Sequence, residues 1–219
     1  HSVTTPHTAT GSAPPVTCNR SFDGLSVRGH SRAMAAAFSS ALTAIHTACE
    51  HIWAGRGDTA IAGGVTVMIT PGGFIGFSQA SMLSPDGRCA AFDATANGFV
   101  RGEGAGIVLL KRLSQAIADG DPIQGVIVGT AVNQDGHTNG ISLPSTEAQT
   151  RLVQDACRDA GVSPAQIGFA EAHGTGTAVG DPSQAPALAK ARCEQHSTPL
   201  PLGSGISNVG HLASAAGIP

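Results

Sequence analysis

The sequence predicts an α/β fold in which helices cover most of a layered sheet. One observation is the segment 39–53, where Leu42, Ile45, Cys49 and Ile52 recur at steps of three and four residues, the spacing of one face of a helix. A second is the pair of apolar segments 59–69 and 104–113, which read as strands. Continuous apolar strands indicate cover on both faces.

The same alternation continues in the rest of the chain. The pattern predicts a strand over 125–132, a helix over 146–161, a short strand over 167–174, a helix over 182–195 and a strand over 199–207. A turn containing Gly210 and His211 then leads into a final helix of small residues. Alternating strands and helices are typical of α/β domains.

Domain organisation follows from composition along the chain. Residues 1–16 are rich in Ser, Thr, Pro and His and show no periodicity, which predicts a flexible N-terminal lead-in. Residues 17–219 are expected to form a single domain, because a chain of 219 residues with 41% hydrophobic residues can bury one sizeable core.

Charge and composition exclude several function classes. The formal net charge is -3 and no run of Lys or Arg occurs, so nucleic acid is an unfavourable partner. The chain has no Tyr, which excludes a phenolic proton donor. No stretch approaches the ~20 apolar residues of a membrane span, and no secretory signal opens the sequence. A cytoplasmic protein is expected.

Charged and metal-binding residues are sparse. Only 12% of residues are charged, about half of the usual ~25%, so the surface is expected to be unusually small, unusually neutral or partly covered by another chain. We interpret this as an indication of assembly. The five cysteines are scattered without a CxxC pair, and the histidines outside the motifs below have no ligand spacing. Reduced, mostly buried thiols and no metal or other cofactor are expected.

Three motifs carry the functional signal: SMLSPDGRCAAFDATANGFVRGEGAGIVLLKRL, EAHGTGTAVGDP and SNVGHLASAAGI. Together they resemble the ketosynthase domains of modular polyketide synthases, members of the thiolase-like condensing enzyme family, over roughly residues 19–218. The resemblance implies an incomplete thiolase-like layered fold of mixed sheets covered by helices. It also implies a cysteine nucleophile that takes an acyl chain from a carrier protein, and two histidines that assist carbon–carbon bond formation.

The sequence departs from the family pattern at several positions. In AMAAAFSSALTAIH, Phe38 occupies the nucleophile position and Ala35 replaces an acidic residue. Ile206 stands where the family carries a lysine, and Gln184 and Pro186 stand where glutamates are usual after GDP. Early strands and a later glycine-rich segment of the family are absent from the sequence, so it is interpreted as a truncated, free-standing protein that no longer condenses.

The two family histidines are retained as His173 and His211. Both are predicted to be catalytic, with Thr175, Thr177, Asn208 and Phe38 as candidate substrate-binding residues. The threonines could equally satisfy backbone groups in a glycine-rich turn. Asp93, Arg101 and Glu103 resemble family residues interpreted as a buried charge network.

Two functions remain open from the sequence. The first is acid–base chemistry on a polyketide chain, such as cyclisation, dehydration or hydrolysis, with a substrate that can be bound to a carrier protein. The second is a non-catalytic docking or scaffold subunit for a carrier protein or a polyketide synthase. A homodimer or larger assembly is expected in both cases.

Overall fold

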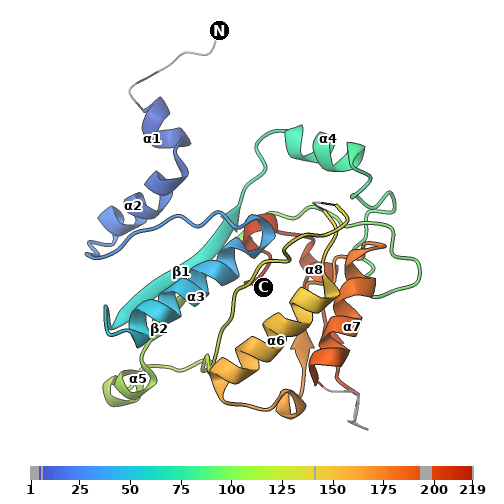
Figure 1. Cartoon of the computed structure of the whole chain (residues 1–219). Coiled ribbons are helices and arrows are strands. Elements are labelled where there is room, and N and C mark those ends of the chain that lie inside the picture. Colours follow the sequence, from blue (N-terminus) through green and yellow to red (C-terminus); the bar gives the residue numbers. More distant parts are fainter. Residues whose placement is uncertain (1–4, 6, 141, 193–198, 219) are drawn as a thin grey trace. The chain divides into compact units, whose positions relative to one another are not determined.

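A computed structural model describes residues 5, 7–140, 142–192 and 199–218 (Figure 1). The chain divides into two units, residues 1–35 and 36–219. The first unit contains helices α1 (Thr8–Ser12) and α2 (Pro14–Gly24). These helices occur although residues 1–16 show no apolar periodicity, and the flexible lead-in expected there stays a prediction. Proline at the first positions of α2 has its φ already set for a helix, a signal that apolar periodicity does not contain.

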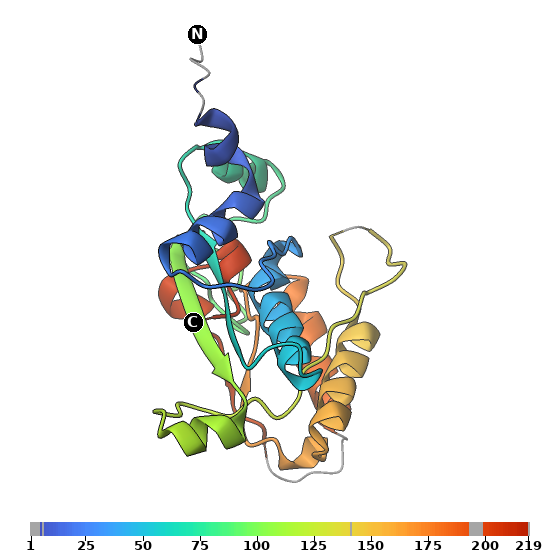
Figure 2. The same cartoon turned by 90° about the vertical axis from the view of Figure 1, so that its left-hand side faces the viewer.

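The second unit begins with the short 3-10 helix η1 (Ala37–Ser39) and helix α3 (Ser40–Trp53), close to the helix predicted from periodicity. Strand β1 (Thr59–Thr66) pairs antiparallel with β2 (Gly104–Lys111), in a register that places Gly64 opposite Gly106. Helix α3 and the 3-10 helix η3 (Ala213–Ala215) pack against β1, as Figure 2 shows for α3. Glycine at position 64 permits this approach, because a Cβ there would lie 2.7 Å from the Ser214 carbonyl oxygen.

The predicted cover on both faces of these strands is wrong. The side chains of β2 alternate in burial, with Ile107 71% and Leu109 70% exposed. Ile61, which pairs with Leu109 in the register, is also exposed. Because α3 and η3 cover only one face of the β1–β2 pair, the other face is apolar and bare in the described part of the chain.

In the sequence, helix α4 (Gly72–Gln79) lies between β1 and β2, and helix α5 (Leu113–Asp119) follows β2. The predicted strand over 125–132 is not formed, since no described residue of it pairs with another strand. Its apolar side chains Val126, Ile127 and Val128 remain exposed. An apolar segment becomes a strand only where a neighbour accepts its backbone hydrogen bonds.

The remaining elements surround the histidine motifs. Helix α6 (Thr146–Ala160) has Ser145 as its N-cap, and Ser145 Oγ accepts a 3.1 Å hydrogen bond from Ala148 N–H. The helix ends at Gly161, the end that the sequence predicts. It packs against α7 (Gly180–Arg192). Residues 193–195, the last three of the helix predicted over 182–195, lie outside the described residues. The last elements are η2 (Pro164–Gln166), β3 (Ala170–Glu171), β4 (Leu202–Gly203) and α8 (Ile206–Val209).

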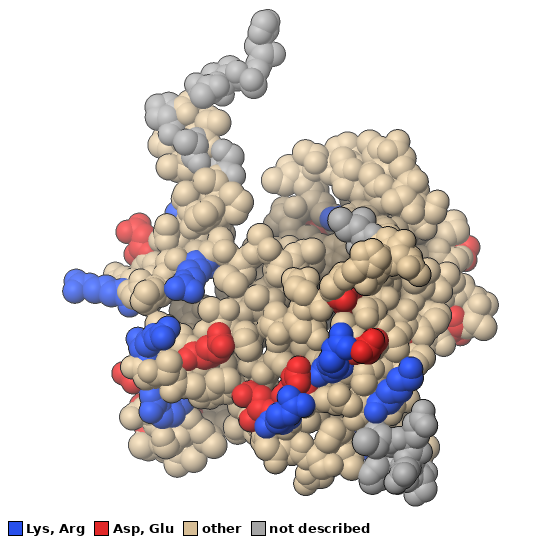
Figure 3. All heavy atoms as spheres, viewed as in Figure 1, with Lys and Arg blue, Asp and Glu red and all other residues tan. Residues whose placement is uncertain are grey.

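Strands β3 and β4 pair in parallel and are much shorter than the segments predicted for them. A small core of Cys89, Phe99 and Ile206, with Phe77 and Val100 packed against it, lies beside them. Charged side chains are scattered over the face shown in Figure 3, in keeping with the low charged fraction. Within the described residues, no helix combines the length and apolarity needed to cross a membrane.

Candidate functional site

The structure brings Phe38, His173 and His211 into direct contact, although they lie far apart in the sequence. The imidazole centroids of His173 and His211 are 4.8 Å apart, with the ring planes at 87°. The phenyl ring of Phe38 lies 4.4 Å from His211 and 6.4 Å from His173, measured between centroids. Three motif positions therefore form one aromatic cluster, which Phe77 and Phe99 extend on the core side.

Backbone pairing fixes the position of His211. Its N–H donates to the Val100 carbonyl at 2.6 Å, and its carbonyl accepts from Gly102 N–H at 2.9 Å. These bonds form an isolated parallel bridge between His211 and Arg101. The loop after α8 is thus attached to the segment that leads into β2, and His211 points toward Phe38 with only 2% of its surface exposed.

The hydrogen bonds of His211 define its tautomer. Nδ1 accepts from Ala213 N–H at 2.9 Å, so the neutral ring carries its proton on Nε2. Nε2 is buried and has no hydrogen-bond partner among the described residues. Burial, the neighbouring His173 and the charge of Arg101 lower the pKa of His211 to about 4. His211 is therefore a neutral hydrogen-bond donor that no described residue engages.

His173 has a different environment. It follows β3, and Ser204 Oγ donates to its carbonyl oxygen at 3.2 Å. Burial of the ring lowers the pKa of His173, while the charge of Asp181 acts in the opposite direction. The side chain nevertheless reaches solvent. Because residue 173 is exposed whereas His211 is buried, His173 is the imidazole of the pair that can exchange protons with bulk solvent.

The HGTGT turn is held by Asp181, at the start of α7. This carboxylate is 5% exposed and accepts hydrogen bonds from Phe92 N–H at 2.6 Å and Gly176 N–H at 3.2 Å. The Thr175 and Thr177 hydroxyls lie 3.1 Å apart, and Thr177 Oγ1 accepts from Gly180 N–H. Both threonines are thus engaged inside the turn, the alternative that the sequence left open, and their contact with substrate stays a prediction.

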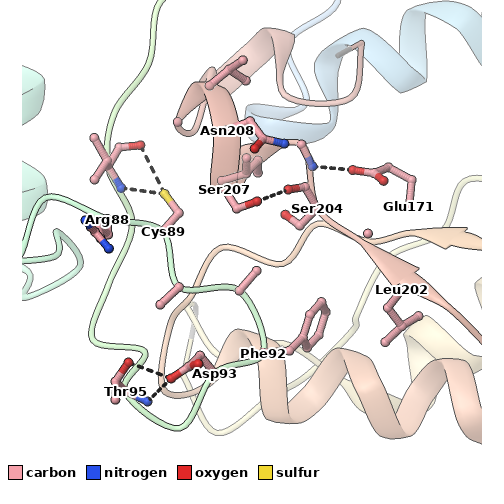
Figure 4. A pocket seen from close by; sticks show the side chains of 18 of the residues that line it. Arg88, Cys89, Phe92, Asp93, Thr95, Glu171, Leu202, Ser204, Ser207 and Asn208 are labelled. Carbon is pink, nitrogen blue, oxygen red and sulfur yellow. Dashed lines mark hydrogen bonds between the residues drawn. The ribbon is translucent and has the colours of Figure 1, made fainter.

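Asn208 lines a pocket of about 1230 Å³ (Figure 4). The pocket is lined by the loop 87–95, by β4 and by residues 203–210, and its labelled side chains include Arg88, Phe92 and Ser207. Neither His173 nor His211 lines it. The sequence does not predict this pocket, because its lining comes from segments that are far apart in the sequence and that only the fold brings together.

The predicted buried charge network of Asp93, Arg101 and Glu103 is wrong. Asp93 is exposed and accepts hydrogen bonds from Thr95. Arg101 places its guanidinium carbon 4.9 Å from the Phe77 ring centroid, and Glu103 is exposed and accepts from Met68 N–H. Each of the three side chains faces a different part of the structure.

Three of the four described cysteines are buried thiols, whereas Cys18 is half-buried. Cys49, Cys89 and Cys157 are buried, and burial raises the pKa of each thiol. Cys193 lies outside the described residues. In the same part of the chain, no group of three His, Cys, Asp or Glu side chains is arranged to hold a metal ion.

Comparisons with known proteins place the chain in a family. The family model described as beta-ketoacyl synthase, N-terminal domain, matches residues 2–116, and the model of the C-terminal domain matches residues 124–219. A phenolphthiocerol/phthiocerol polyketide synthase chain of Mycobacterium tuberculosis is 47% identical over 97% of this chain, and the chain covers 14% of that protein. Polyketide synthase GfsA of Streptomyces halstedii is 46% identical over 97% of the chain, which covers 3% of it.

Solved structures give the same assignment. The ketosynthase from module 6 of the bacillaene synthase from Bacillus subtilis 168 superposes with a TM-score of 0.92 and 41% sequence identity, over 95% of this chain and 38% of that one. The chain therefore spans a small part of the curated relatives and less than half of the solved ketosynthase. The expected thiolase-like fold is confirmed, and the chain belongs to the beta-ketoacyl synthase family as part of a ketosynthase-like domain of the polyketide synthase type.

Proposed function

We propose that this chain is a non-condensing ketosynthase-like protein of polyketide biosynthesis that uses His173 and His211 for acid–base chemistry on a polyketide chain. The supporting observation is the contact between the two imidazoles, 4.8 Å apart, beside a phenyl ring at the family's nucleophile position. The reaction is a cyclisation, dehydration or hydrolysis without covalent capture. The substrate is a polyketide thioester that a carrier protein can deliver.

The two histidines have different roles in this proposal. His211 is neutral, its proton is fixed on Nε2 and that N–H has no partner among the described residues, which suits it to donate to a developing oxyanion. His173 reaches solvent and lies beside Asp181, which suits it to move protons. Separate roles fit the difference in their surroundings.

A cyclisation illustrates the step. Neutral His173 removes a proton from the carbon between two carbonyl groups of the substrate, and the electron pair of the C–H bond moves onto a carbonyl oxygen that accepts from His211 Nε2–H. The resulting enolate carbon bonds to another carbonyl carbon of the same chain, whose π electrons move to its oxygen. Protonated His173 returns its proton to this alkoxide, so the substrate and product have the same composition.

Mass spectrometry of products tests the proposal. The protein is incubated with carrier-bound β-ketoacyl thioesters of several chain lengths, with His137→Ala as a matched control because His137 is exposed and belongs to neither histidine motif. We expect an isomer of the substrate, or loss or gain of one water, that depends on both His173 and His211. Substrates that stay unchanged across the series would overturn the acid–base function.

The second candidate function is a docking or scaffold subunit. The bare apolar face of the β1–β2 pair supports it, with Ile107 and Leu109 each about seven-tenths exposed. Contiguous apolar surface of this kind marks an interaction site. Binding to a carrier protein or synthase without any change in the bound acyl chain is the result expected for this candidate.

A further inference from the structure

Gln184, on helix α7, contacts the residue that follows His173. Its Oε1 accepts a hydrogen bond of 3.0 Å from the backbone N–H of Gly174. Gln184 is half-buried, and its partner Gly174 is buried. The ketosynthase resemblance implies glutamate in this region, so the chain keeps the acceptor oxygen while it lacks the charge.

Gly174 is held from both sides. Its carbonyl oxygen accepts from Ser204 Oγ at 2.8 Å, in addition to the bond that its N–H makes to Gln184. Its φ of +47° is strained for any residue with a side chain, and a Cβ there would lie 2.7 Å from the Ser204 Cβ. A residue with both backbone groups engaged has little freedom, so the neighbouring His173 is held in one orientation relative to α7.

The charge around His173 comes from a small set of groups. Burial lowers the pKa of His173, and Asp181, which lies one turn before Gln184 on α7, contributes a carboxylate charge that partly offsets this. From the other loop, His211 faces the ring, and Arg101 contributes positive charge at His211. Glutamate at position 184 would add a second carboxylate to the face of α7 that carries Asp181.

We propose that Gln184 is a positioning residue for His173, an inference that rests on the proposed acid–base function. Its amide oxygen holds the Gly174 peptide, and its neutrality keeps a second carboxylate away from the imidazole pair. The consequence is that His173 stays neutral, and therefore able to accept a proton, at a lower pH than it would beside glutamate.

NMR titration of the histidine side chains tests the charge part directly. In Gln184→Glu the acceptor is kept and a charge is added, so we expect the titration midpoint of His173 to rise by about one pH unit. The matched control is Gln124→Glu, which adds the same charge at an exposed position outside the site. A midpoint that moves no further in Gln184→Glu than in Gln124→Glu would overturn the proposal.

Two further measurements separate positioning from general stability. Gln184→Leu removes the acceptor without adding charge, and it should lower the rate of product formation without raising the His173 midpoint. In the unmodified protein, the Gly174 amide should exchange with solvent far more slowly than an exposed amide. Rapid exchange would contradict the positioning role even if neither variant folds. Titration and exchange do not require activity, so they give a result even if the acid–base function fails.

Discussion

The imidazole of His211 meets the phenyl ring of Phe38 at 4.4 Å between centroids and 66° between planes, an edge-to-face contact at the position that the sequence predicts for a nucleophile. His211 Nε2 has no hydrogen-bond partner among the described residues, although it is buried. If position 38 is the nucleophile position that the sequence predicts, a phenyl ring that can only pack stands there, beside a buried hydrogen-bond donor that no described residue engages.

The first prediction concerns covalent chemistry. Exposure to a short-chain acyl thioester should give no stoichiometric, site-specific adduct, because a phenyl ring cannot attack a thioester and the pKa of each buried thiol is raised. Intact-mass measurement checks this. A single acylated cysteine at full occupancy would contradict it.

Restoring the nucleophile extends the same test. Phe38→Cys should accept an acyl group at most, without condensation, because Ile206, at the position where the resemblance implies a lysine, is 5% exposed in the apolar core. The measurement is product analysis with an acyl and a malonyl thioester together. Detection of a chain-extended product would show that the retained residues suffice for condensation.

The catalytic prediction concerns the histidine pair. His173→Ala or His211→Ala should lower the rate of product formation by roughly 100-fold or more, the usual contribution of a positioned proton-transfer group. The two losses should be less than additive in the double variant, because groups that act together do not contribute independently. Since burial lowers the pKa of His173, the acidic limb of the rate profile should lie below the ordinary histidine range.

The control for this experiment is His137→Ala, which should leave the rate unchanged. His46 is a poorer control, since its Nδ1 lies 2.7 Å from Thr130 Oγ1 and its loss should also affect stability. If both site variants stay folded and product yield is unchanged, the docking function replaces the acid–base function.

Stability should depend on pH through His211. Its folded pKa of about 4 lies below the ordinary histidine value, so the unfolded chain binds the proton first as pH falls. The neutral imidazole of His211 contributes fully to the free energy of unfolding above about pH 6.5, and this contribution is lost as the pH falls toward about 4. The loss corresponds to about 3 kcal/mol of unfolding free energy. Denaturant unfolding at a series of pH values measures it. His211→Asn, which does not titrate, should flatten this part of the profile, and an unchanged slope would assign the effect to other groups.

Self-association is the fourth prediction. The bare face of the β1–β2 pair should be covered by a second copy or another partner, because large exposed apolar patches are rare on monomers. Sedimentation at micromolar concentration should show a dimer or larger species for the native chain. Ile107→Lys with Leu109→Lys should shift it toward the monomer, whereas Val162→Lys, outside this face, should not. A native chain that sediments as a monomer without binding an apolar dye would exclude the idea.

The sequence predicts the helices of this fold better than its strands. The helices α3 and α6 are found because a 3.6-residue period and a terminal Gly161 are local signals. The strand predicted over 125–132 fails because pairing depends on a neighbour that the segment itself does not specify. The prediction that both faces of the β1–β2 pair are covered is wrong for the same reason, because the burial of a strand depends on which elements pack against it.

The site shows the same division. Motifs identify Phe38, His173 and His211, and the structure brings these three together. Their electrostatic difference was not predictable, since it depends on which nitrogen of His211 meets Ala213 N–H and on which ring reaches water. The pocket that Asn208 lines depends on the same kind of non-local packing.

The backbone at Ala37 has a consequence for how this site can change. Its φ of +47° is in the left-handed region that residues with a side chain seldom adopt, and it precedes Phe38 directly. Ser40 Oγ donates to the Ala37 carbonyl and accepts from Ala36 N–H, so the bend is held by groups outside position 38. The direction of side chain 38 is therefore set by its neighbours, so Phe38→Cys should change the reactivity of this position while the path of the chain is kept.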